Sequence, residues 1–190
     1  MARTGATDIY AALLDEDMAA GTASVAADSG FYVGMVVSVD ISPDNQSSEL
    51  WANNMRVEFA DGSPSGTITL ASDNIENTAF SKLLGHTFAQ ADNEMDYADS
   101  DTAPNVLIGT VEHDQVGGAK SYTAMIFKKV IFTEPPISLA TRTKQTTFNT
   151  TQIVGNYSVD ANGKWLKRKT FTTQAAAKAW LEEELEYSAS

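Results

Sequence analysis

The chain has 190 residues, no cysteine and a formal net charge of −12, with 25 acidic residues against 13 basic ones. A chain of this length fits one domain with a hydrophobic core, and without cysteine it has neither disulfides nor a thiolate metal site. The acidic balance argues against DNA binding, which needs Lys and Arg to neutralise phosphates. No apolar run reaches the roughly 20 residues of a membrane helix. We therefore expect a soluble protein made inside the cell.

The first 28 residues are rich in Ala, Gly, Thr, Ser and Asp and show only weak periodicity. We predict an N-terminal arm over 1–28, with one apolar anchor from Ile9 to Leu14 and a flexible stretch over 19–29. The remainder, 29–190, is predicted to be a single β domain.

Two segments with alternating apolar side chains flank a long insertion. The first, 31–41, places Val33, Met35, Val37, Val39 and Ile41 on one face, and the second, 67–70, resumes the pattern. Such alternation is typical of half-buried strands. Hairpin loops usually have about 2–5 residues, so the insertion over 43–66 is too long for an ordinary turn. It contains the apolar residues Leu50, Trp51, Met55, Val57 and Phe59. A solvated loop has no use for such side chains, which indicates that the insertion contacts another copy of the chain.

A short helix is predicted between Asp73 and Gly85. Asp73 can cap the first turn, Glu76 follows three residues later as in a capping box, and Gly85 suits the left-handed residue that ends a helix. Its predicted inward face consists of Ile75, Ala79, Phe80, Leu83 and Leu84.

An acidic stretch over 91–104 follows this helix. It begins at Asp92 like a calcium-binding loop, but Tyr97 stands where that loop needs glycine and Ala103 where it needs a bidentate Glu. We therefore expect a solvated acidic loop.

Four further strands are predicted over 106–113, 121–132, 146–154 and 164–171. Gly117 and Gly118 supply the positive φ angles of a hairpin turn between the first two. Pro135 and Pro136 end the second strand because proline lacks an amide donor. A further turn is predicted from Asp160 to Gly163.

The last predicted element is a helix that begins after Thr172 or Thr173 and runs to about Glu186, with an apolar stripe of Ala177, Trp180, Leu181 and Leu185. Since few strands alternate with helices, antiparallel pairing is expected rather than a parallel sheet. We predict a mainly β fold with flanking helices: an antiparallel β-sandwich or small barrel with a long inter-strand loop and the C-terminal helix packed on its flank.

Nothing in the sequence indicates catalysis. There is no Gly-x-Ser-x-Gly elbow and no phosphate-binding glycine loop. His86 and His113 are the only histidines, and neither has the helical partner of a zinc site, so we interpret each as hydrogen-bonded or solvent-facing. We expect no enzyme activity, no cofactor and no metal site.

One charge pattern points to contacts within or between subunits. A basic strand containing Lys164, Lys167, Arg168 and Lys169 precedes a helix whose end carries Glu182, Glu183, Glu184 and Glu186. Negative charge at a helix C-terminus is disfavoured by the helix dipole, so either solvent screens these glutamates or a basic partner lies opposite. The basic strand is the candidate partner, within one subunit or between neighbours.

The ordered series of these features resembles the major tail proteins, or tail tube proteins, of long-tailed phages with non-contractile tails. The densest similarity covers 104–155 and includes Gly109, Gly117-Gly118, Tyr122–Ala124, Phe127–Phe132, Pro135 or Pro136, Thr143-Lys144, Phe148–Thr150 and Gly155. Further similar segments are Ser65–Leu70, Leu83–His86, Gly163–Trp165 and Ala177–Leu181. Leu50–Asn54 is similar to the family's loop motif, although Asn53 and Asn54 replace its usual acidic pair.

The resemblance implies a β-barrel or sandwich subunit, six of which close a ring, and stacked rings that form the tail tube through which genomic DNA is ejected. It also implies that the insertion over 43–66 and the N-terminal arm bridge successive rings. The implied partners are further copies of the chain, a tape-measure protein, a tail terminator and tail-tip proteins. The implied location is the virion, after synthesis in the bacterial host cytoplasm.

An alternative function of another class is a calcium- or carbohydrate-binding β-sandwich module. Calcium-dependent folding, or saturable glycan binding by a stable monomer, would distinguish that module from an assembling subunit.

Overall fold

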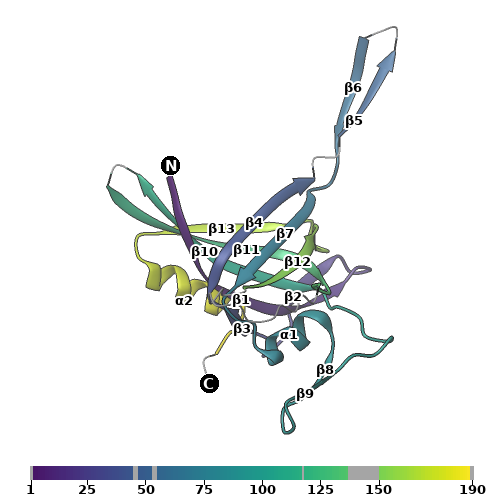
Figure 1. The fold of residues 1–190 in the computed structure, drawn as a ribbon. Helices are drawn as coiled ribbons and strands as arrows, with labels where there is room; N and C mark the ends of the chain where they lie inside the picture. Colours follow the sequence, from purple (N-terminus) through teal and green to yellow (C-terminus); the bar gives the residue numbers. More distant parts are fainter. Residues whose placement is uncertain (1, 45–46, 53–54, 117, 137–149, 189–190) are drawn as a thin grey trace, which may run out of the picture.

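The computed structural model describes residues 2–44, 47–52, 55–116, 118–136 and 150–188. The described chain is mainly antiparallel β with two helices, as the sequence predicted (Figure 1). In chain order the elements are β1 (Ala2–Asp17), β2 (Thr22–Val25), β3 (Phe31–Gly34), β4 (Val36–Asp44), β5 (Ser47–Ala52), β6 (Met55–Asp61), β7 (Ser65–Ser72), α1 (Asn77–Leu84), β8 (Thr87–Ala89), β9 (Glu94–Asp96), β10 (Val106–Val116), β11 (Ala119–Thr133), β12 (Thr151–Tyr157), β13 (Leu166–Phe171) and α2 (Gln174–Glu184).

Antiparallel backbone pairings run in a circuit around the molecule. Strand β1 pairs with β10, β10 with β11, β11 with β12, β12 with β7, and β7 with β4. Strand β3 returns to β1. Because only Met35 separates β3 from β4, the stretch from 31 to 44 hydrogen-bonds to β1 at one end and to β7 at the other.

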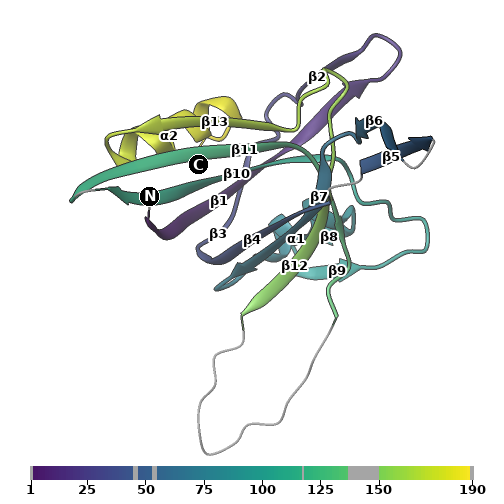
Figure 2. The ribbon, with the colours of Figure 1, turned by 90° about the horizontal axis from the view of Figure 1, so that it is seen from above.

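Strand β11 divides the sheet into two parts (Figure 2). Its first part, from Tyr122 to Phe127, pairs with β13, while its last part, from Val130 to Thr133, pairs with β12. The strands therefore splay apart along β11. The part of the sheet around the beginning of β11 contains β1, β10 and β13, and the part beyond its end contains β12, β7 and β4.

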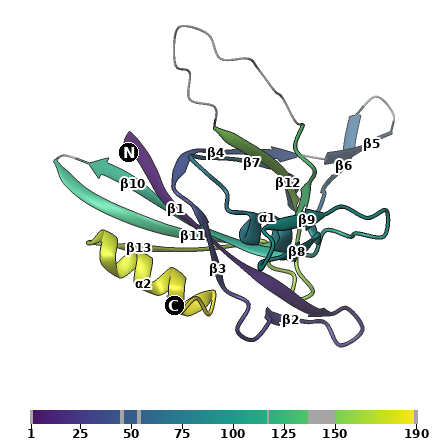
Figure 3. The ribbon, with the colours of Figure 1, turned by 60° about the horizontal axis from the view of Figure 1, so that its bottom comes forward.

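The side chains of β1, β10 and β11 alternate between two hydrophobic clusters. On one face, Ile9 and Phe127 pack with residues of α1, β7 and β12, among them Leu83, Leu70 and Ile153. On the opposite face, buried residues at α2 pack on side chains of the sheet. The helix contributes Ala177, Trp180, Leu181 and the capping residue Leu185, and the sheet contributes Tyr10, Ala12, Leu107, Val111, Ala124 and Ile126. Helix α2 thus covers the outside of the sheet along its flank, as predicted (Figure 3).

The N-terminal segment differs from the predicted arm. Residues 2–17 form β1, which pairs with three other strands, and Ile9, Tyr10, Ala11 and Ala12 are each at most 1% exposed. A strand covered on both faces is apolar on both faces and loses the alternation that marks a half-buried strand. The weak periodicity of this segment therefore reflects burial in the sheet.

The predicted single strand over 31–41 is interrupted. A bulge between Val36 and Ser38 changes which side chains face the core. Val36 and Val39 pack against the core, whereas Met35 and Val37 are 62% and 55% exposed. The predicted common face therefore holds for Val39 but not for Met35 and Val37.

Both helices end or begin at predicted residues. Gly85 ends α1 in the left-handed conformation, with φ 80°, and Thr173 caps α2 by accepting a hydrogen bond from the Ala176 amide. Asp73 does not cap α1: its carboxylate accepts from the Met35 amide at 3.2 Å, and the capping position belongs to Glu76, whose side chain makes no capping bond. Of the predicted inward face of α1, Ile75, Ala79, Leu83 and Leu84 are buried and Phe80 is partly buried.

The predicted hairpin of β10 and β11 is confirmed and is longer than expected on both strands. Gly118 has φ 88° at its turn, and β11 ends before Pro135. The predicted strand over 146–154 is described from Thr151, where β12 begins, because residues 137–149 lie outside the described residues. The segments over 143–149 that resemble the tail tube family also lie outside the described residues.

We predict that Ile9→Ala lowers the free energy of unfolding by about 2–5 kcal/mol, because it leaves a cavity beside a fully buried strand. Val37→Ala, on a side chain that is 55% exposed, should change it by less than about 0.5 kcal/mol. Urea unfolding of the dilute protein measures both values. If both variants lowered the free energy of unfolding by similarly small amounts, residues 1–28 would instead be an arm outside the core.

Candidate functional site

A two-stranded hairpin projects from the body where the sequence predicted an insertion. Strands β4 and β7 stay paired up to Asp44 and Ser65, and β5 and β6 continue beyond them as a separate two-stranded sheet. Figure 1 shows this hairpin extending away from the rest of the molecule. The insertion over 43–66 is thus largely strand, where a loop was expected.

The predicted contact residues all lie on this hairpin. Leu50 and Trp51 belong to β5, and Met55, Val57 and Phe59 belong to β6. In the backbone register, Trp51 lies opposite Arg56 and Leu50 opposite Glu58, which leaves Val57 at a bulge. The structure describes the backbone here and not these side chains, so their contacts with another copy stay a prediction.

The hairpin has no backbone pairing with the rest of the described chain. Strands β5 and β6 hydrogen-bond only to each other. An isolated two-stranded hairpin is at best marginally stable in water, because it has no third strand or helix on which to bury a face. A surface that packs on β5 and β6 must therefore come from another molecule if the hairpin is to be rigid.

The described outward side chains of one sheet face carry no positive charge, and all of them except the buried Ala71 are at least partly exposed. On β4, β7, β12 and the last part of β11, the side chains that point away from the core form cross-strand rows. The described residues of these rows are Ser38, Asp40, Ser42, Thr67, Thr69, Ala71, Ile131, Thr133, Gln152, Val154 and Asn156. None is Lys, Arg or aromatic, and no described helix covers them.

Several strands of the large sheet have a single partner among the described residues, and β4 and β13 are two of them. Within the described residues, β4 hydrogen-bonds only to β7, and β13 only to β11. Exposed edges offer unpaired backbone groups to another chain. The β4 edge carries Asp40 and Asp44, whereas the β13 edge carries Lys167, Arg168 and Lys169, so the two edges have opposite charge.

The predicted charge pairs are partly formed within one chain. The Lys167 amine lies 2.5 and 2.6 Å from the two carboxylate oxygens of Glu184. Lys169 lies over the rings of Phe171 and Trp180, at 5.2 and 5.7 Å from their centroids. The C-terminal helix is therefore tied to β13 by an ion pair and by cation–π contacts.

The other predicted charges have different neighbours. Arg168 points to the opposite face of β13 and lies 3.1 Å from the buried carboxylate of Glu112. Glu182 accepts from the Tyr10 hydroxyl at 3.2 Å, and Glu186 accepts from the Asp28 amide at 3.3 Å. Glu183 is exposed. Pairing of these charges between copies stays a prediction.

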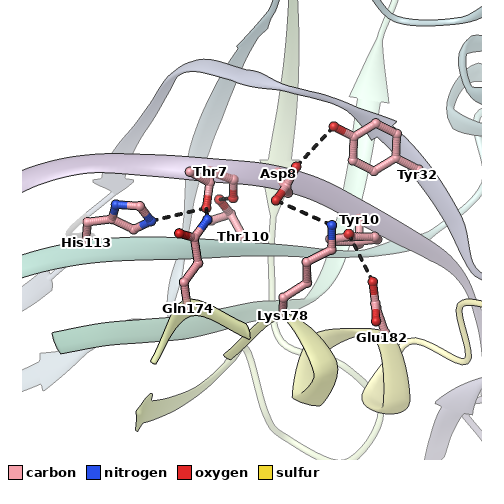
Figure 4. A network of polar contacts seen from close by, with 9 residues as sticks. All are labelled: Thr7, Asp8, Tyr10, Tyr32, Thr110, His113, Gln174, Lys178 and Glu182. Carbon is pink, nitrogen blue, oxygen red and sulfur yellow. Dashed lines mark hydrogen bonds and ion pairs between the residues drawn. The ribbon is translucent and has the colours of Figure 1, made fainter. Parts of the chain in front are cut away.

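A polar network missed by the sequence analysis ties α2 and β3 to β1 (Figure 4). Asp8 lies at a bulge of β1 with φ 49°, a conformation that Asp tolerates better than most residues. Its carboxylate accepts from the Tyr32 hydroxyl at 3.1 Å and lies 3.8 Å from the Lys178 amine. Only the bulge turns Asp8 toward both partners, and no sequence pattern marks a bulge.

Burial and the nearby carboxylates keep the phenols of this network protonated. Burial and then the Asp8 charge raise the pKa of Tyr32 to about 12. The pKa of Tyr10 is also raised above its ordinary value, by burial and by the charges of Asp8 and Glu182. Both hydroxyls therefore act as hydrogen-bond donors at neutral pH, which fits a structural role.

The same network continues along β1 through Thr7. The Thr7 hydroxyl lies 3.2 Å from Nε2 of His113 and accepts from the Gln174 amide at 3.4 Å, while the Thr110 hydroxyl donates to the Thr7 carbonyl at 3.3 Å (Figure 4). The start of α2 is thus bonded to the same strand as its end. His113 is hydrogen-bonded, as predicted.

His86 joins the acidic segment after α1 to the end of β11. Its Nδ1 lies 2.8 Å from Asp101 and its Nε2 2.9 Å from Glu134, and its side chain is 9% exposed. Burial alone would lower the pKa of His86, but the hydrogen bonds and charges of the two carboxylates outweigh burial and raise it. Bonds to the Ala98 amide and to His86 lower the pKa of Asp101.

The described residues contain no group of three or more His, Asp or Glu side chains placed to hold a metal ion. In the acidic segment, β8 and β9 form a short hairpin where a solvated loop was expected. No helix of the described chain is long and apolar enough to cross a membrane.

We predict that His86 stabilises the fold in a pH-dependent way. Its raised pKa means that its contribution is complete below the unfolded-state value of about 6.5 and is lost as pH rises through the higher folded-state value. The melting temperature of His86→Gln should therefore lie furthest below that of the parent near pH 5.5 and approach it by pH 9. Glu134→Gln should show a smaller pH-dependent loss, since Asp101 remains. A deficit for His86→Gln that is constant from pH 5.5 to 9 would contradict this assignment.

Comparison of the chain with protein-family models found no match, and no curated protein matches it.

Proposed function

We propose that this chain is a structural subunit that assembles head to tail into hexameric rings, and that stacked rings form the tail tube of a long-tailed phage with a non-contractile tail. The observation that carries the proposal is the projecting hairpin of β5 and β6. It contains Trp51 among five apolar residues and has no supporting surface in the described part of its own chain. A neighbouring ring supplies that surface, with Trp51 as a buried anchor.

The open edges support ring formation. A head-to-tail contact is heterologous, so one surface of a subunit must fit a different surface of the next, and a closed ring leaves neither exposed. The edges of β4 and β13 differ in charge and are separate, since β4 ends the strand order and β13 branches from β11. Joining them around a ring covers both edges and limits uncontrolled aggregation.

The exposed face of β4, β7, β12 and β11 suits a channel for DNA. Lys and Arg bind phosphates, and this face has neither among its described outward residues. Six copies at −12 each total 6 × −12 = −72 per ring. A lumen lined by such a face lets DNA pass without being held.

This function fixes the partners and location that we propose. The tube contacts a tape-measure protein, a terminator and tail-tip proteins in the virion, and its subunits are made in the host cytoplasm. The alternative, a carbohydrate-binding module, has less support, since the described outward residues of the sheet face include no aromatic side chain on which a sugar ring could pack.

Electron microscopy of the purified protein, dilute and then concentrated, tests the proposal. The parent chain should form hollow rings or tubes. Trp51→Ala should leave the monomer folded and lower the yield of tubes about tenfold or more, because the anchor of the ring contact is lost. Met18→Ala, on an apolar side chain of the body that is 71% exposed, is the matched control and should assemble like the parent. Equal assembly of Trp51→Ala and parent would remove Trp51 from the contact, and a parent that stays monomeric when added to purified tail tips would contradict the function.

A further inference from the structure

A pocket lined in part by three lysines lies between β2 and β13. Its volume is about 400 Å³. The apolar side chains that line it are Leu14, Val25, Leu107 and Leu166, and the amines are those of Lys128, Lys164 and Lys167. Lys128 belongs to β11, Lys167 to β13, and Lys164 to the turn before β13. In a chain of net charge −12, three lysines meet at this pocket, opposed by the carboxylate of Asp160, which also lines it, and by that of Glu184, which pairs with Lys167.

The Lys128 amine has no partner among the described residues. Lys128 is half-buried, and neither a hydrogen bond nor an ion pair engages its Nζ. Burial, followed by the charge of Lys167, lowers its pKa. The neighbouring Lys129, by contrast, lies 2.6 Å from Glu16. The carboxylates of Glu184 and Asp160 act on this half-buried amine without hydrogen-bonding to it, so an anion placed directly beside it would offset more of the cost of its burial.

The acidic groups at the pocket are already engaged. Glu184 forms an ion pair with the Lys167 amine, at 2.5 Å. Asp160 accepts from the Lys164 backbone amide at 2.7 Å, which holds the turn. The pocket therefore favours an incoming carboxylate on an apolar body, since its lining combines aliphatic residues with Lys128 and Lys164, which form no ion pair within the described part of the chain.

The hairpin of β8 and β9 has this chemistry. Between 92 and 99 it carries Asp92, Glu94, Asp96 and Asp99 and no Lys or Arg. Acidic and apolar residues alternate along Glu94-Met95-Asp96-Tyr97, and Tyr97 is 60% exposed. The hairpin projects from the body (Figure 1). Within one chain, the charges that act on Lys128 come from Lys167, Glu184, Asp160 and Lys164, so its own hairpin does not reach it.

We propose that the pocket of Lys128, Lys164 and Lys167 binds the β8–β9 hairpin of a second copy of this chain, with Glu94 and Asp96 at the amines and Met95 or Tyr97 against its aliphatic side chains. The two surfaces differ, so the contact is heterologous and propagates from copy to copy. The proposal rests on self-assembly of the chain and adds a second contact to that of the β5–β6 hairpin.

Carbodiimide cross-linking of a mixture of ¹⁴N- and ¹⁵N-labelled protein tests the contact, because this reagent joins a carboxylate to an amine in direct contact and isotope labelling separates copies. The expected product is a mixed-isotope peptide pair in which Lys128 or Lys164 is joined to Glu94 or Asp96. Assembly without this pair, or with only same-isotope pairs, overturns the proposal while leaving the tube intact. A chain that stays monomeric overturns both proposals, and mixed pairs in oligomers that are not rings support the pocket and contradict the tube.

A charge swap gives a second readout by sedimentation. Lys164→Glu and Asp96→Lys should each weaken self-association about threefold to tenfold at low salt, and the double variant should recover most of that loss. Lys120→Glu, an equal charge change on an exposed residue near the far turn of β10 and β11, is the control and should have little effect. Lys128→Gln should weaken association and should not lower the melting temperature of the dilute protein, because it removes a half-buried charge that the monomer leaves without a direct partner. Additive losses in the double variant, with no recovery, overturn the contact.

Discussion

Pairing along β1 is the constraint on which the rest of the fold depends. This strand hydrogen-bonds to β10 along most of its length, to β2 near its end and to β3 at its middle. Its successive residues alternate between two hydrophobic clusters, so Ile9 faces α1 while Tyr10 faces α2. Asp8 then uses a bulge in β1 to bind Tyr32 and Lys178. Both helices and the return of β3 are therefore positioned by one strand.

Three features of the described chain lack a partner within the subunit, and none of them belongs to β1. Among the described residues, the hairpin of β5 and β6 has no backbone pairing outside itself, the edges of β4 and β13 have one partner each, and the Lys128 amine has no hydrogen bond or ion pair. Each is unfavourable in an isolated subunit, and in the proposed assembly each is covered by another copy. Since the proposed contacts are between unlike surfaces, they would lead to a closed ring or a filament.

Periodicity predicted the parts of the fold that are buried on one face only. Strand β7, the hairpin of β10 and β11, the stop at Gly85 and the cap at Thr173 were all visible in the sequence, because each depends on local alternation or a single capping residue. Strand β1 was missed because burial on both faces removes alternation. The phase of β4 changed at a bulge near Val37, and the lysine pocket exists only because pairing of β11 with β13 brings Lys128 near Lys167.

Hydrogen exchange of the β5–β6 amides tests most directly whether the hairpin is completed by another copy. In the dilute monomer, amides over 47–52 and 55–61 should exchange far faster than those of β1 and β10, because an unsupported hairpin opens locally. After assembly the same amides should become protected, while protection of β1 stays unchanged. Protection of the hairpin that is equal in monomer and assembly would contradict the account, since it would show that the hairpin is stable without a neighbour.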